Sequence, residues 1–197
     1  MSVIDTLITG RTQSDIQYRD ELRERYINRT ATPAEIAEWA AGLKGAYNAS
    51  DLNRVESAVA YLVGRFNDLP GELADYLNSL GVAPDALFDV PYSHPISLTV
   101  KTDWAVADIP LNTQMERYIS NINAIRSIIT IPAETPATPT DVQGLTVTEA
   151  NDIEAILKAV DGATLALEAL KKSYADLTAD AWRYCGTFNC GQGVILP

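Results

Sequence analysis

A cap-plus-helix pattern that occurs three times constrains the fold of this chain more than any other feature. The copies span residues 50–62, 113–125 and 148–160. Each copy opens with Ser or Thr at the expected N-cap and then places apolar residues three or four positions apart, which predicts an amphipathic helix. Repetition of one such unit is typical of a part that is stacked or docked. The predicted caps and apolar stripes are Ser50 with Leu52, Val55, Val59, Leu62 and Val63, Thr113 with Met115, Tyr118, Ile119, Ile122, Ile125 and Ile129, and Thr148 with Ala150, Ile153, Leu157, Val160, Leu167 and Leu170.

The likeness between the three helices has two explanations. Unrelated amphipathic helices also resemble one another, because their apolar residues must recur every three or four positions. A duplicated unit is favoured by the hydroxyl at each cap and by the tryptophans that precede the first two copies, Trp39 and Trp104. We interpret both tryptophans as core plugs over the starts of these helices. The third copy has no such tryptophan, and both explanations stay open.

Composition and charge exclude several classes of protein. The chain has 197 residues, of which 47% are hydrophobic and 21% charged, as in an ordinary folded domain. The formal net charge of -11 disfavours nucleic-acid binding, because an acidic surface repels phosphates. No apolar run approaches the roughly 20 residues of a membrane span, so no membrane insertion is expected. The N-terminus lacks the pattern of a secretory signal, which favours synthesis and folding in a cytoplasm.

Local signals predict further elements. Residues 12–15 and 32–35 have the spacing of capping boxes. Pro70 is expected to end the first repeat helix, with a separate helix over 72–80 and Gly81 as its left-handed C-cap. Residues 96–100 alternate apolar and polar, which predicts a strand that pairs with another subunit or with the C-terminal tail.

The predicted fold class is mainly α, with minor β structure at 96–100 and in the C-terminal tail. The Pro- and Thr-rich stretch is too poor in large apolar residues to form a core and is expected to be a linker. The predicted organisation is a helical domain over 1–130 with two repeat-like helices, a linker over 131–145, the third repeat helix over 146–178, and an irregular aromatic and Gly-rich tail over 179–197.

No residue set identifies a reaction. His94 is the only histidine, no serine lies in a G-x-S-x-G motif, and a loop histidine is the favoured interpretation. Cys185 and Cys190, with one histidine elsewhere, do not supply the four ligands of a structural zinc, and free thiols are favoured over a disulfide. We therefore expect no catalytic residue, no metal, no cofactor and no enzymatic activity.

Six polar or aromatic residues form a candidate interaction surface. For the polar trio of the first repeat, a docking surface is one interpretation. The favoured alternative is that these side chains satisfy backbone groups of the preceding loop or pair with one another across a turn. The candidate residues are Asn53, Arg54, Glu56, Trp104, Arg117 and Trp182.

Five short motifs resemble segments of tail-region proteins from phages and prophages of Gram-positive bacteria. The motifs are residues 47–56, 101–104, 115–118, 149–154 and 182–191. The resemblance implies a non-enzymatic, homo-oligomeric virion component near the tail tip, baseplate or fibre. Its partners would be copies of itself and other virion proteins. Its location would be the virion, after synthesis in the cytoplasm of the host bacterium.

The chain also departs from complete host-binding fibres. We find no long β-rich region, no collagen-like repeat and no extended heptad run, so a connector, collar or fibre-base subunit fits better. Two alternatives remain. One is a cytoplasmic helical adaptor or assembly chaperone that is absent from the finished particle. The other is a small carbohydrate- or cell-wall-binding module that uses the C-terminal aromatic residues, Trp182 among them.

Overall fold

The computed structural model describes residues 2–83 and 89–187, with side chains through residue 181. Every regular element within these ranges is a helix, which confirms the mainly α class, and these ranges contain no β-strand. The elements are η1 (Val3–Thr6), α1 (Gln13–Ile27), α2 (Pro33–Ala41), α3 (Ala49–Ser79), α4 (Asn112–Ile128) and α5 (Val147–Thr187).

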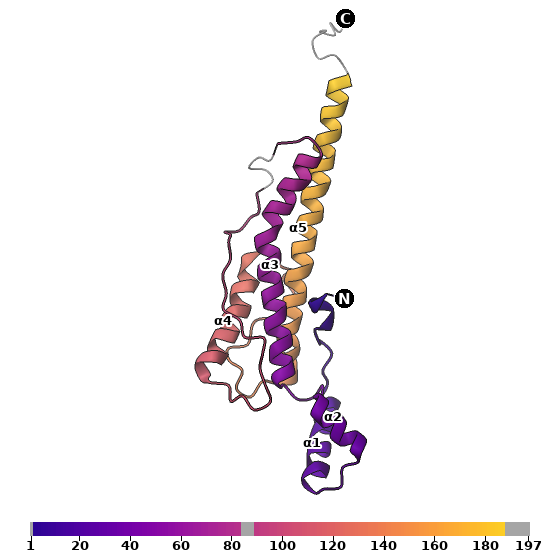
Figure 1. Cartoon of the computed structure of the whole chain (residues 1–197), viewed down its shortest axis with the longest axis vertical. Helices are drawn as coiled ribbons and strands as arrows, with labels where there is room; N and C mark the ends of the chain where they lie inside the picture. Colours follow the sequence, from indigo (N-terminus) through magenta and orange to yellow (C-terminus); the bar gives the residue numbers. More distant parts are fainter. Residues whose placement is uncertain (1, 84–88, 188–197) are drawn as a thin grey trace, which may run out of the picture.

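The helices α3, α4 and α5 form a bundle in which all three run in the same direction (Figure 1). Contacts between α3 and α5 advance together along both helices, from the Arg54–Glu154 ion pair to the hydrogen bond between Tyr76 and Asp176. Because the helices are parallel, each connection between them must return along the outside of the bundle. The three N-terminal ends therefore lie together, beside the α1–α2 hairpin (Figure 1).

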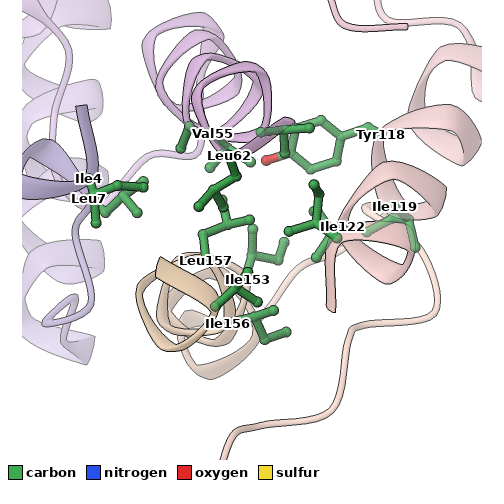
Figure 2. Close-up of a cluster of buried hydrophobic side chains, with 14 of the residues drawn as sticks. Ile4, Leu7, Val55, Leu62, Tyr118, Ile119, Ile122, Ile153, Ile156 and Leu157 are labelled. Atoms are coloured by element: carbon green, nitrogen blue, oxygen red, sulfur yellow. The ribbon is translucent and has the colours of Figure 1, made fainter. Parts of the chain in front are cut away.

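The predicted apolar stripes meet in one core. Figure 2 shows side chains of α3, α4 and α5 converging, while Ile4 and Leu7 approach from the N-terminal segment on the side away from α4. Most of the predicted stripe residues are buried, but Leu170 of the third stripe is 67% exposed. The buried ones are Leu52, Val55, Val59, Leu62, Tyr118, Ile119, Ile122, Ile125, Ala150, Ile153, Leu157 and Val160.

The predicted caps of the three repeats are displaced by two residues, although α5 begins beside the predicted start of the third repeat helix at 146. The predicted caps Ser50, Thr113 and Thr148 lie inside the first turn of their helices. In each helix the N-cap is the residue two positions earlier, namely Asn48, Leu111 and Thr146. The side chain three positions after each N-cap accepts a hydrogen bond from the backbone N–H of that N-cap, as in a capping box. These backbone N–H to side-chain pairs are Asn48 with Asp51, Leu111 with Gln114, and Thr146 with Glu149.

Pro70 does not end the first repeat helix, and residues 72–80 are not a separate helix but almost wholly the last turns of α3. Leucines on both sides of the proline continue the buried face of α3. A proline inside a helix leaves the carbonyl four residues earlier without its donor, here that of Phe66. The Tyr92 hydroxyl donates to this carbonyl at 3.1 Å and replaces the lost bond. Gly81 has a φ of 74°, which confirms the left-handed C-cap.

The Tyr92→Phe variant tests this compensation. We expect it to lower the free energy of unfolding by about 1 kcal/mol, because the Phe66 carbonyl loses its donor. In a Pro70→Ala background the backbone amide of the introduced alanine restores the helical bond, so the same change should cost much less. Urea denaturation of the four proteins measures the difference. Equal costs in both backgrounds would show that the Tyr92 hydroxyl does not substitute for the missing amide.

Residues 96–100 are extended, but they form no strand, so the prediction of β structure here was wrong. Side chains of the helices take the place of a neighbouring strand. The amide of Asn67 accepts from the Ile96 N–H at 2.6 Å and donates to its carbonyl at 2.9 Å, while Asn121 donates to the Thr99 carbonyl at 2.8 Å. The segment therefore lies against α3 and α4 with its polar backbone groups partly satisfied.

The expected linker and tail also differ from the prediction. Residues 131–145 lie along the bundle, where Arg126 donates to the carbonyls of Thr135 and Pro136, and the apolar residues at both ends of the segment pack against the core. The helix α5 continues past position 178, so residues 179–187 are helical rather than irregular. The C-terminal half of α5 is rich in Ala and Leu, which are strong helix formers. The remainder of the expected tail lies outside the described residues.

Candidate functional site

A buried ionic cluster lies where α3, α5 and the segment before α1 meet. Arg11 Nη2 is 2.6 Å from Oδ1 of Asp51 and 2.6 Å from Oε1 of Glu154. Arg54 Nη2 lies 2.8 Å from the same Glu154 oxygen and also pairs with Asp51. Glu154 is fully buried, and each charge in the cluster faces two of the opposite sign. This balance is what makes burial of four charges tolerable.

Two side chains of α5, which we call the α5 clasp, hold the backbone of residues 8–11. The Asn151 amide donates to the Arg11 carbonyl at 2.9 Å and accepts from the Arg11 N–H at 2.9 Å. Glu154 accepts from the N–H of Ile8. Since residues 8–11 have no neighbouring strand or helical bonds, these side chains satisfy backbone groups that would otherwise be buried without partners.

The helix α3 repeats this arrangement with Asn53 and Glu56, the α3 clasp. The Asn53 amide donates to the Trp104 carbonyl at 2.9 Å and accepts from its N–H at 2.6 Å. Glu56 accepts from the N–H of Lys101 at 2.9 Å. Both clasps read Asn-x-x-Glu, and each holds two residues of an extended segment that are three positions apart.

An arginine from a neighbouring helix completes each clasp. Arg54 of α3 binds Glu154 of the α5 clasp, and Arg117 of α4 binds Glu56 of the α3 clasp at 2.6 Å. The equivalent positions of α4 hold Glu116, which is exposed, and a buried isoleucine, so α4 forms no third clasp. The sequence likeness between copies one and three therefore extends to the contacts that they make.

The electrostatics of these groups follow from their burial and from the groups that they contact. Burial raises the pKa of Glu56, although the Lys101 N–H and the Arg117 guanidinium act in the opposite direction. Tyr47 and Tyr118 bond to each other through their hydroxyls, and burial raises the pKa of both, so they stay neutral at physiological pH. In the part of the chain that the structure describes, no group of three His, Cys, Asp or Glu side chains is arranged to hold a metal ion.

The candidate interaction residues from the sequence lie largely within the bundle. The structure brings Asn53, Glu56, Trp104 and Arg117 together at the α3 clasp, and Arg54 joins the ionic cluster. Glu56 is 1% and Trp104 5% exposed, so neither contributes to an exposed docking surface. The described side chains do not include Trp182.

Sequence reasoning missed the residues of the second clasp and the ionic cluster, Arg11, Asp51, Asn151 and Glu154. The signal that could have found half of them is the Asn-x-x-Glu spacing, which recurs at the same place in copies one and three. The interpretation of Trp39 as a core plug was wrong, because it is half-buried in α2 and stacks on Tyr26 with ring centroids 5.9 Å apart.

Large apolar side chains are exposed at opposite ends of the bundle. Where the three helices begin, the loop 105–111 carries Val106, which is 96% exposed, and Ile109, which is 84% exposed. Beside this loop, the α2–α3 connection and Trp104 line an open cavity of about 410 Å³. Toward the other end, Leu170 and Leu177 of α5 are 67% and 68% exposed.

Comparisons with protein-family models, with curated proteins and with solved structures found no match to this chain. Among the helices of the described ranges, none combines the length and the apolar character needed to cross a membrane.

Proposed function

We propose that this chain is a non-enzymatic structural subunit of a phage or phage-like particle, a connector in the tail, the baseplate or the base of a fibre. The observation that carries the proposal is the exposure of large apolar side chains at both ends of an elongated bundle. The loop 105–111 supplies one surface and the C-terminal half of α5 supplies the other. Exposed apolar patches mark contact sites for other proteins, and a connector needs two of them.

The interior of the bundle supports this role. The two clasps and the ionic cluster fasten the extended segments to the helices, so that the ends keep a fixed relation to each other. The polar groups of this interior are used to hold the chain together. The partners are copies of the chain and other virion proteins, and neither a cofactor nor nucleic acid takes part. The motif resemblance to tail-region proteins supplies the context of the particle.

The main alternative is a cytoplasmic adaptor or assembly chaperone, which would use the same two surfaces but would be absent from the finished particle. The experiment is to purify particles by density gradient from cells that carry the gene and to quantify the chain by peptide mass spectrometry. We expect it at a constant ratio to the other tail proteins. Abundance in the lysate with absence from the particles would overturn the proposal and favour the alternative.

A variant links this result to the loop 105–111. Val106→Asp combined with Ile109→Asp should remove the chain from particles, while circular dichroism stays that of the parent, because both side chains are exposed. Leu165→Asp is the matched control, since Leu165 is an exposed leucine elsewhere on the bundle, and it should enter particles normally. Equal incorporation of all three proteins would show that the loop is not a docking surface.

A further inference from the structure

The helix α5 carries a regular apolar seam that continues beyond the region covered by α4. Apolar residues along it alternate at spacings of three and four, the heptad pattern of a coiled coil, over about four heptads. The sequence-based statement that the chain has no extended heptad run was therefore wrong. The α5 seam consists of Ile153, Ile156, Val160, Ala163, Leu167, Leu170, Tyr174, Leu177 and Ala181.

Burial along the α5 seam changes with the presence of α4. Ile153 and Ile156 are fully buried, and Ile153 belongs with residues of α4 to one core (Figure 2). Farther along, α4 has ended and α3 and α5 continue as a pair (Figure 1). Leu167 is half-buried against the cluster of Leu69, Leu73 and Val90, whereas Leu170 is mostly exposed. The upper part of the seam thus continues an established helix–helix interface into a region where the third helix of the bundle is missing.

The charges beside the exposed part of the seam suit a second copy of the same helix. The carboxylate of Glu168 lies toward α3 and is paired with Arg65 at 2.5 Å and with Lys172 at 2.6 Å. In a chain of net charge -11, two copies would otherwise repel each other, because like charges beside a seam oppose pairing. The positions that flank the seam over residues 163–181 are Thr164, Ala166, Lys171, Ser173, Thr178 and Asp180, of which one is acidic and one is basic.

We propose that α5 of a second copy covers the exposed part of the seam, so that the chain self-associates through a coiled coil over residues 163–181. A heptad seam is complementary to a helix with the same repeat, and a sustained repeat of this length is the sequence signal of such pairing. The same repeat occurs in α3 from Leu52 to Leu80, but there it is largely buried within the bundle. The exposed part of the α5 seam is therefore matched by the same part of a second copy. The inference rests on the proposed function in one respect: it identifies the partner of one of the two exposed apolar surfaces, that of α5.

The experiment is the molar mass of the full chain by light scattering on a sizing column under reducing conditions, across a range of micromolar concentrations. We expect a dimer or a higher oligomer. The double variant Leu170→Glu, Leu177→Glu should weaken self-association by about a hundredfold or more, since it places charge on two seam layers. Both side chains are exposed in the single chain, so the helical circular dichroism should not change.

Leu165→Glu is the control, because Leu165 is 51% exposed on the same helix but lies off the seam. It should leave the molar mass of the parent unchanged. A monomeric parent at every concentration overturns the proposal, as does an equal effect of the control and the double variant. Neither result bears on whether the chain is present in purified particles. Conversely, absence of the chain from particles would not contradict self-association through the seam. The two proposals can therefore fail independently.

Discussion

Replacing Glu154 by alanine is expected to lower the free energy of unfolding by about 3–5 kcal/mol, the range for breaking a buried ion pair by removing one partner. Glu154 is fully buried and accepts from Arg11, from Arg54 and from the Ile8 N–H. Its removal leaves two guanidinium groups facing the single carboxylate of Asp51. Chemical denaturation followed by circular dichroism measures the loss, with the denaturant slope checked for two-state behaviour.

Two variants control for this effect. Glu116→Ala removes an exposed carboxylate from α4 and should change stability by no more than about 0.5 kcal/mol. The combined variant Arg54→Met, Glu154→Leu removes a positive and a negative group together and should cost less than Glu154→Ala alone, because Arg11 and Asp51 then remain as a balanced pair. A loss below about 1 kcal/mol for Glu154→Ala would show that water or rearrangement compensates the stranded arginines.

Replacing Phe66 by alanine is expected to cost about 3–5 kcal/mol, through lost burial and the cavity that remains. Phe66 is fully buried, and the Tyr92 ring meets it edge-on with centroids 5.1 Å apart. The hydroxyl of the same tyrosine donates to the Phe66 carbonyl in place of the N–H that Pro70 lacks. The cavity would therefore also weaken this hydrogen bond. Thermal and urea unfolding both report this loss.

Phe66→Leu is the matched control, because it keeps most of the apolar volume and should cost less than about 1.5 kcal/mol. The difference between the two variants isolates the cavity from the loss of the aromatic contact. Similar small losses for both would mean that the segment around Tyr92 collapses into the space, which would contradict a rigid core at this level of the bundle.

The sequence predicted the parts of the fold that depend on near neighbours. The stripes of α3, α4 and α5 were visible because an apolar face repeats within one helix, as from Val55 to Leu62. The capping box of Thr32 with Glu35 was visible because its partners are three residues apart. Gly81 was visible as a C-cap because a left-handed residue after a helix favours glycine.

What the sequence could not reveal depends on partners far apart in the chain. Pro70 was expected to end a helix because the hydroxyl of Tyr92, which replaces the missing donor, is not adjacent in sequence. Residues 96–100 were expected to pair as a strand because an alternating pattern does not distinguish a neighbouring strand from the amides of Asn67 and Asn121. The clasps have a visible spacing, but the segments that they hold do not follow from it.

The parallel arrangement of the helices has a consequence for how the protein is made. Arg11 and its partner Glu154 are 143 positions apart, so the first segment of the chain has its partner in the last helix. Contacts of such long range slow folding, since a large loop must close before they form. On the ribosome, which delivers the N-terminus first, Arg11 and the apolar Ile4 and Leu7 have no partner in α5 until that helix has been synthesised and has emerged. The nascent chain therefore exposes its N-terminal segment until then.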